Sequence, residues 1–186
     1  MKKTPLIIIS VLVLAVVGWL LISNTGQHQN MNTGNNTITQ TQTDSATKSD
    51  KAPDFHLQDY SGKTVKLTDF AGRPLVINSW AAWCPFCKKE LPDFVTAQKE
   101  FGGKVVIIAI NRQESLATAK GYTDMQGTSN DLIFLLDPGD SLYQSIGGFS
   151  MPETIFVDTN GNIADHKRGP MDIHEIRQKI QKLISS

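Results

Sequence analysis

Residues 75–94 have the sequence LVINSWAAWCPFCKKELPDF, which holds the only two cysteines of the 186-residue chain, Cys84 and Cys87. The apolar run LVINSW is typical of a buried strand. A helix is predicted from Cys84 to about Phe101, with Pro85 at its first position, where a missing N–H costs nothing. This stretch therefore predicts two thiols at the N-terminus of a helix that directly follows a strand.

This placement favours redox chemistry. The free amides of Phe86 and Cys87 should point toward the Cys84 sulfur, and together with the helix dipole they favour its thiolate form. Cys84 is therefore predicted to be the exposed nucleophile. Cys87 is predicted to be the resolving thiol, which breaks the mixed disulfide that Cys84 forms.

Other uses of the two cysteines are less favoured. An inert disulfide would close a very short loop, so it would remove little entropy from the unfolded chain. A structural zinc site needs four ligands, and the chain has no paired histidine spacing to complete one, so no metal site is predicted. A copper-binding module that uses Cys84, Cys87 and Met151 stays open as an alternative.

The rest of the chain from residue 52 alternates strand and helix patterns. Strands that alternate with helices imply a central sheet, partly parallel and covered on both faces. We therefore predict an α/β fold with a central mixed sheet, helices on both faces and an N-terminal β-hairpin. The predicted strands are 55–58, 64–67, 75–80, 105–111, 131–137, 154–158 and 162–167, and the predicted helices are 67–70, 84–101, 114–125, 141–146 and 172–184.

The N-terminal part has a different composition. Residues 5–22, PLIIISVLVLAVVGWLLI, are uncharged and would span about 27 Å as a helix, close to the hydrocarbon thickness of a bilayer. Lys2 and Lys3 precede them and should stay in the cytoplasm. We therefore predict a single-pass protein of the cell membrane; a cleaved signal peptide is the alternative. Its segments would be a cytoplasmic 1–4, a transmembrane anchor 5–22, a flexible polar linker 23–51 and an extracytoplasmic domain 52–186.

The charge balance bears on possible partners. The chain has 18 basic and 18 acidic residues, so its formal net charge is zero. Proteins that bind nucleic acid usually carry a clustered basic face. We therefore predict no nucleic-acid partner.

Three segments together resemble a known family. NSWAAWCPFCKKELPDF is similar to the active-site segment of thioredoxin-fold proteins, and specifically of the TlpA/ResA-like extracytoplasmic thiol–disulfide oxidoreductases. APDFHLQDYSGKTVKLTDFAGRPLVINSW resembles the lead-in hairpin and first core strand of that family, and SMPETIFVDTNGNI resembles its later proline, strand and hairpin. The resemblance covers about residues 52–182 and implies a thioredoxin-like fold.

The resemblance also implies roles for individual residues. Pro152 corresponds to the family's cis-proline beside the dithiol, and Glu90 to an acidic residue held near it. Glu90 is therefore the candidate for moving protons to and from Cys87, because thioredoxin's own buried Asp is replaced here by Asn78, which cannot titrate. The predicted substrate-binding residues are Trp83, Pro85, Phe86, Met151 and Pro152.

The function predicted from these observations is that of an anchored enzyme that exchanges disulfides on proteins. It would need no organic cofactor. Acting as a reductant in an oxidising compartment, it would need a membrane-embedded electron donor as a partner. By analogy with the family, its substrates would be apocytochrome c, in cytochrome c biogenesis, or other oxidised proteins.

Two further activities stay open. A dithiol oxidase would use the same residues with the opposite electron flow, and Pro85 directly after Cys84 is compatible with that activity. A peroxidase is disfavoured, because peroxiredoxins place Thr or Ser three residues before the reactive cysteine, where this chain has Ala81.

Overall fold

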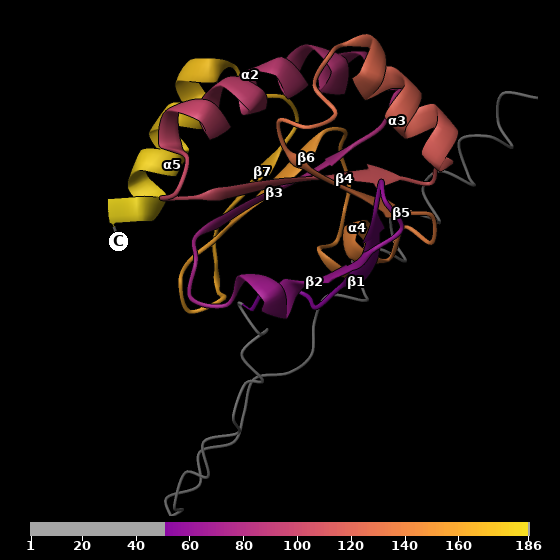
Figure 1. The fold of residues 1–186 in the computed structure, drawn as a ribbon. Coiled ribbons are helices and arrows are strands. Elements are labelled where there is room, and N and C mark those ends of the chain that lie inside the picture. Colours follow the sequence, from indigo (N-terminus) through magenta and orange to yellow (C-terminus); the bar gives the residue numbers. More distant parts are fainter. Residues whose placement is uncertain (1–50, 186) are drawn as a thin grey trace, which may run out of the picture. The chain divides into compact units, whose positions relative to one another are not determined.

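The computed structural model describes residues 51–185, which form a seven-stranded mixed sheet with helices on both faces (Figure 1). The order of strands across the sheet is β2-β1-β5-β4-β3-β6-β7. The middle strands β5, β4 and β3 run parallel, and the other neighbours pair antiparallel. The strands are β1 (His56–Asp59), β2 (Thr64–Lys66), β3 (Leu75–Trp80), β4 (Val106–Arg112), β5 (Ile133–Asp137), β6 (Glu153–Val157) and β7 (Ile163–Arg168).

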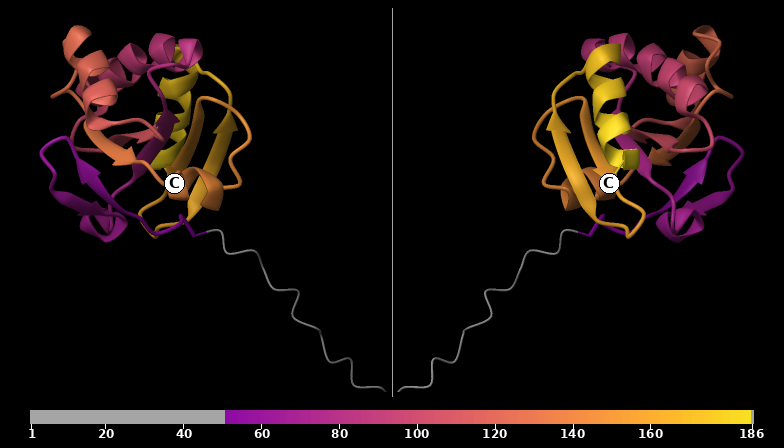
Figure 2. Two further views of the ribbon diagram at one scale, coloured as in Figure 1. Left: turned by 90° about the vertical axis from the view of Figure 1, so that its right-hand side faces the viewer. Right: turned by 90° about the vertical axis from the view of Figure 1, so that its left-hand side faces the viewer.

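Helices cover the two faces unequally. One face carries α2, α3 and α5, and Figure 2 shows α5 beside α2. The other face is covered by α4, by the one-turn helix η1 and by the β1–β2 hairpin. The described helices are η1 (Leu67–Phe70), α2 (Pro85–Phe101), α3 (Leu116–Met125), α4 (Ser141–Ser145) and α5 (Ile173–Ser185).

The core has two layers because side chains alternate along each strand. In β3, Val76 and Trp80 pack under α2 and α5, whereas Leu75 and Ile77 pack on the opposite face. Both sets are buried, which explains why LVINSW does not alternate between apolar and exposed polar residues; its two polar residues, Asn78 and Ser79, are buried as well. The dithiol therefore follows a strand that is fixed from both sides.

Most of the predicted architecture is confirmed. The N-terminal hairpin, the mixed sheet and the helices on both faces are present, and each predicted strand and helix has a counterpart whose ends differ by a few residues. Helix α5 buries Ile176, Ile180 and Leu183, which recur at helical spacing along one face.

The predicted membrane anchor at 5–22 lies outside the described residues, as do segment 1–4 and nearly all of the predicted linker. Within residues 51–185, no helix combines the length and the apolar character that crossing a membrane requires. Lys51, the last residue of the predicted linker, pairs with Asn162 in an isolated bridge. The anchor and its topology therefore stay predictions.

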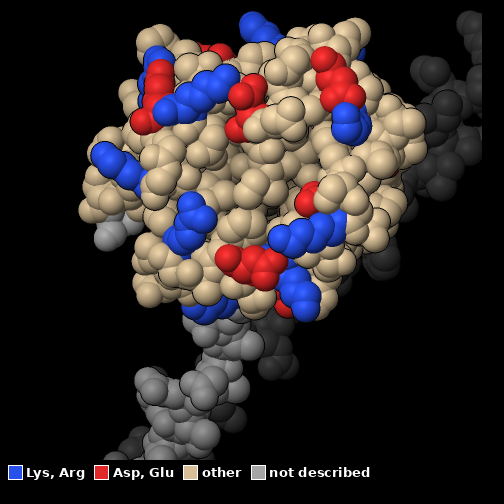
Figure 3. Space-filling model, in the orientation of Figure 1, with Lys and Arg blue, Asp and Glu red and all other residues tan. Residues whose placement is uncertain are grey.

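The surface has mixed charge. On the face shown in Figure 3, Lys and Arg side chains lie among Asp and Glu side chains, and neither sign gathers into a patch. Some charged side chains of the described residues are paired directly, as in Arg177 with Glu100 and Lys167 with Glu175. This face therefore has no basic cluster of the kind that tracks a phosphate backbone.

Candidate active site

The two cysteines lie where β3 turns into α2, and they are joined in a disulfide. Cys84 caps the N-terminus of the helix, and its backbone is extended, with φ −85° and ψ 111°. The amide of Cys87 donates a hydrogen bond to the Cys84 sulfur over 3.1 Å. Pro85 takes the first helical position, as predicted, and the sulfur accepts from an amide of the first helical turn, that of Cys87.

The prediction that Cys84 is exposed is wrong for this oxidised form. Only 2% of Cys84 and 1% of Cys87 reach solvent. The Cys84 sulfur is turned back onto Cys87, and both cysteines belong to the apolar cluster that includes Trp80, Ala81 and Leu91. A substrate therefore has to approach through the surface residues around the pair.

The residues around the N-terminus of α2 provide an apolar surface. Trp83 is 61% exposed and Phe86 57% exposed, and Pro85 between them along the chain is also exposed. Exposed apolar side chains that gather beside a reactive dithiol suit contact with another protein.

A second segment, directly before β6, packs against the apolar cluster that contains the dithiol. The Met151–Pro152 peptide bond is cis, as the family resemblance implied. Pro152 is buried, and Met151 is half-buried and packs against the cluster that contains Cys84 and Cys87. The structure thus brings the predicted site residues of α2 and of the Met151–Pro152 turn to one region. Close to them in the chain, Phe149 is 85% exposed, and the sequence analysis did not identify it.

Glu90 lies one helical turn beyond Cys87 and is only 2% exposed. Its Oε1 accepts a hydrogen bond from the Met171 amide over 2.9 Å, and its Oε2 accepts one from Asn78 Nδ2 over 3.3 Å. Burial raises the pKa of Glu90 to about 8, although both hydrogen bonds lower it. Glu90 can therefore exchange a proton near neutral pH.

Asn78 links this glutamate to the next strand. Its side-chain amide, which is buried, also donates to Thr154 Oγ1 over 3.0 Å. Asn78 and Thr154 lie opposite each other in the β3–β6 ladder, so the network follows from the strand register. The sequence analysis noted only that Asn78 cannot titrate. Its position beside Glu90 depends on a pairing between distant segments.

Two further glutamates hold backbone near the site, and the sequence analysis missed both. Glu114 Oε2 accepts a hydrogen bond from the Ala82 amide over 2.8 Å, just before the dithiol. Glu153 Oε2 accepts from the amides of Phe149 and Ser150 over 2.8 and 3.0 Å. The sequence could have indicated Glu153, because it follows a proline at the start of an apolar run. A charged side chain in a buried strand needs hydrogen-bonding partners.

A metal site is not found in the part of the chain that the structure describes. No three or more His, Cys, Asp or Glu side chains there are grouped so that they could hold a metal ion. Among the described residues, no His, Asp or Glu therefore joins Cys84 and Cys87 as a third ligand for copper. Met151, the third ligand of the copper-binding alternative, is of a residue type that this grouping does not include.

A dithiol that closes into a disulfide at the start of a helix, on this order of strands, is the working part of thioredoxin-like thiol–disulfide oxidoreductases, and the chain is an enzyme of that class. It belongs to the Redoxin family, whose family model matches residues 47–182.

Similar proteins support both statements. The thiol:disulfide interchange protein DsbE of Allochromatium vinosum is 31% identical over 140 residues, which are 72% of this chain and 74% of that protein. The thiol-disulfide oxidoreductase ResA of Bacillus thuringiensis subsp. konkukian is 28% identical over 138 residues, 72% of this chain and 76% of that protein. A solved structure from Chlorobium tepidum, described as a DsbE, superimposes with a TM-score of 0.67 at 25% identity and covers 73% of this chain and 96% of its own. The thioredoxin-like fold and the resemblance inferred from the sequence are confirmed.

The burial of Glu90 predicts a pH-dependent stability. The pKa of about 8 in the folded chain lies above the ordinary 4.5, so the folded state keeps a proton that the unfolded chain releases. This contribution is fully present below pH 4.5 and is lost as the pH rises through 8. As the pH rises from 5 to 8, the free energy of unfolding of Glu90→Gln should therefore increase by about 3 kcal/mol relative to that of the unsubstituted chain.

Urea unfolding of both oxidised proteins across this pH range measures the difference. Glu100→Gln is the matched control, because Glu100 lies on the same helix, is exposed and pairs with Arg177. The difference in the free energy of unfolding between Glu100→Gln and the unsubstituted chain should stay constant over that pH range. A flat difference for Glu90→Gln as well would show that Glu90 is already ionised in the folded protein.

Proposed function

We propose that the enzyme reduces disulfides of proteins outside the cytoplasm. The observation that carries this proposal is the environment of the Cys84–Cys87 pair: in the described part of the chain, the Cys84 sulfur accepts one hydrogen bond, from the Cys87 amide, and a buried glutamate lies one turn further along. A strong dithiol oxidant owes its potential to a stabilised reduced form. A single amide beside a nearby carboxyl stabilises the Cys84 thiolate less than the surroundings of a strong oxidant's thiolate do. The reduced form of the enzyme is then less favoured, and this favours a reductant.

The reaction runs in two exchanges. The Cys84 thiolate attacks one sulfur of a substrate disulfide, so a mixed disulfide forms and the other substrate sulfur leaves as a thiolate. The Cys87 thiol then loses its proton and attacks the Cys84 sulfur, which forms the Cys84–Cys87 disulfide and releases the second substrate sulfur. Two electrons have passed from the enzyme to the substrate; the proton of Cys87 goes to one substrate thiolate, and the other substrate thiolate takes its proton from water.

In this mechanism Glu90 carries the proton of Cys87. It lies three residues after Cys87, a spacing that places both side chains on one face of α2, and both are buried. A carboxyl with a pKa of about 8 can accept a proton from the thiol and return it to a leaving thiolate near neutral pH. Glu90 therefore acts on the resolving step and on the reverse reaction.

The substrate would bind across two segments. Trp83, Pro85 and Phe86 provide the exposed apolar surface at the start of α2. Met151 and Pro152 border the dithiol from β6, where an extended substrate segment could pair with the Met151 backbone. Such a site recognises a strand-like stretch of protein more than a particular small molecule.

The predicted anchor at 5–22 determines where in the cell the enzyme would act. It would hold the described domain outside the cytoplasm, where thiols tend to be oxidised. The disulfide formed in each cycle must then be reduced again by a donor that carries two electrons across the membrane, which implies a membrane-embedded partner. By analogy with the DsbE and ResA relatives and the resemblance stated above, the haem-attachment cysteines of apocytochrome c are the candidate substrate.

The direction of electron flow predicts the reduction potential. Equilibration of the Cys84–Cys87 pair with glutathione or dithiothreitol buffers should give a value near or below roughly −270 mV, as in thioredoxin. A value near roughly −120 mV would instead identify a dithiol oxidase, because such a potential drives disulfides into substrates.

The order of attack predicts which cysteine is trapped by a substrate. Cys87→Ser should accumulate a mixed disulfide through Cys84, since no resolving thiol remains, and mass spectrometry of the trapped complex identifies the partner. Cys84→Ser is the matched control and should trap little, because Cys87 is not the attacking thiol. Equal trapping by the two variants would contradict the assigned roles.

The role of Glu90 predicts a change in thiol reactivity. The alkylation rate of the reduced chain should show a step at the pH where Glu90 ionises, because its charge alters the ionisation of the neighbouring thiol. Glu90→Gln should lose this step, whereas Glu100→Gln should keep it. Identical rate profiles for the unsubstituted chain and Glu90→Gln would remove Glu90 from the mechanism.

A further inference from the structure

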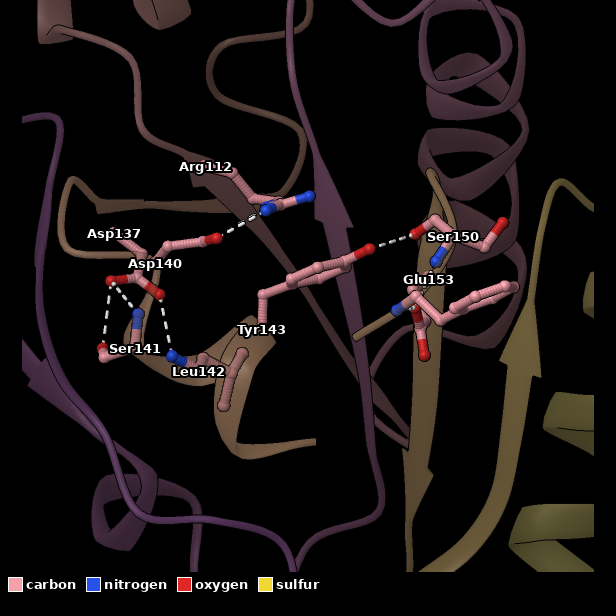
Figure 4. A network of polar contacts seen from close by, with 9 residues as sticks. Arg112, Asp137, Asp140, Ser141, Leu142, Tyr143, Ser150 and Glu153 are labelled. Carbon is pink, nitrogen blue, oxygen red and sulfur yellow. Dashed lines mark hydrogen bonds and ion pairs between the residues drawn. The ribbon is translucent and has the colours of Figure 1, made fainter. Parts of the chain in front are cut away.

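A polar network outside the dithiol ends on the segment that borders it. This segment, residues 149–152, joins α4 to β6 and contains the exposed Phe149 and the half-buried Met151. We call it the substrate loop. Figure 4 shows the side chains that converge on it.

Two groups fix the Ser150 backbone. The Tyr143 hydroxyl donates a hydrogen bond to the Ser150 carbonyl over 2.9 Å, as the dashed line in Figure 4 shows. On the amide side, Glu153 accepts from Ser150 over 3.0 Å and from Phe149 over 2.8 Å. The loop residue next to Met151 is therefore held at both its carbonyl and its amide.

The Tyr143 ring is itself held firmly. The guanidinium carbon of Arg112 lies 3.4 Å from the ring centroid, and Arg112 Nε donates to Asp140 Oδ1 over 2.6 Å. The side chains of Arg112 and Asp140 are only 13% and 6% exposed. Gly148 also packs against the ring: a Cβ added there would lie 2.3 Å from a ring carbon, so that position requires glycine.

The start of α4 is fixed in the same region. Asp137, at the end of β5, accepts hydrogen bonds from the amides of Ser141 and Leu142 over 3.0 and 2.9 Å. Asp140 adopts a left-handed backbone, with φ +58°, which turns its side chain toward Arg112. The ends of β4 and β5 thus determine where the Tyr143 hydroxyl lies.

A buried ion pair is a poor way to gain stability alone, since apolar side chains of similar volume often stabilise a core as well or better. Its value lies in fixing one geometry. Here the geometry that it fixes ends at a backbone carbonyl of the substrate loop. The network links the carboxyl ends of the interior strands β4 and β5 to the site at which a substrate would bind.

We propose that Tyr143, held by Arg112 and Asp140, is a positioning residue that sets the substrate loop for an extended segment of a partner protein. This inference rests on the proposed function, because it assumes that the loop contacts the substrate. Tyr143 does not touch the reacting sulfurs. Its loss should therefore weaken the binding of a peptide and leave the reactivity of the dithiol unchanged.

Two probes with the same leaving group separate these effects. One is free 5,5′-dithiobis(2-nitrobenzoate), which presents little more than a disulfide. The other is a short extended peptide whose single cysteine carries the same nitrothiobenzoate group as a mixed disulfide. With either probe, Cys84 forms a new disulfide and the coloured nitrothiobenzoate thiolate leaves. Cys87 can then displace the probe's other thiol.

Tyr143→Phe removes only the hydroxyl and keeps the ring under Arg112. In single-turnover measurements on the reduced full-length chain, the concentration of peptide probe that gives half the maximal rate should rise about fivefold, the effect of one ordinary hydrogen bond. The maximal rate and the rate with the free reagent should stay the same. Tyr122→Phe is the matched control, because it removes a tyrosine hydroxyl outside this network, and it should leave both probes unaffected.

An unchanged half-maximal concentration for Tyr143→Phe would overturn the inference. An equal loss of reaction rate with both probes would also overturn the inference, because it would show that Tyr143 has a general structural role. The proposed function would fail in a different way. If the reduced, unsubstituted chain released the leaving group from neither probe, or had an oxidase's potential, the reductase assignment would fall regardless of Tyr143.

Discussion

Ser79 of β3 and Glu153 of β6 lie opposite each other in an antiparallel ladder, and this pairing assembles the site. Ser79 comes shortly before the dithiol turn, and Glu153 directly follows Pro152, so the ladder brings two segments together that are more than seventy residues apart in the chain. The next pair along the ladder, Asn78 and Thr154, supplies the polar contact to Glu90. A register shift of one residue would turn these side chains to the opposite face and separate the glutamate from its partners.

The local part of the site could be predicted from the sequence because its causes are local. A strand, a turn and a helix that begins with Cys84 and Pro85 need only neighbouring residues, and periodicity with helix-capping rules identifies them. Glu90 was identified by its spacing from Cys87 and by resemblance. Its burial could not be predicted, because it depends on the Met171 amide, which a loop before α5 brings to the carboxylate.

The parts that sequence reasoning missed depend on long-range packing. Tyr143 belongs to a predicted helix, but nothing local shows that its hydroxyl reaches Ser150 or that Arg112 covers its ring. The expected exposure of Cys84 was wrong for a related reason. Capping rules place the residue at a helix end, but the bond to Cys87 and the surrounding apolar cluster decide how much of it reaches water.

Three glutamates hold backbone segments around the site, and the surroundings of Glu90 and Glu153 suit these two to different tasks. Each accepts hydrogen bonds from backbone amides of a segment that flanks the site: Glu90 from Met171, Glu114 from Ala82, and Glu153 from Phe149 and Ser150. Burial raises the pKa of Glu90, and its two hydrogen bonds do not offset this. Burial also acts on Glu153, but the two amides and His166, whose Nε2 lies 2.6 Å away, outweigh it and lower the pKa.

Glu153 is therefore suited to remain a fixed anion that holds the substrate loop, whereas Glu90 can take up and release a proton beside the resolving thiol. In the proposed mechanism, the same residue type thus holds the substrate loop at one position and transfers a proton at another. The difference arises from the number and charge of the donors around each carboxylate. These different tasks agree with the inference drawn for Tyr143. The two groups that fix the Ser150 backbone, Tyr143 and Glu153, both hold the substrate loop.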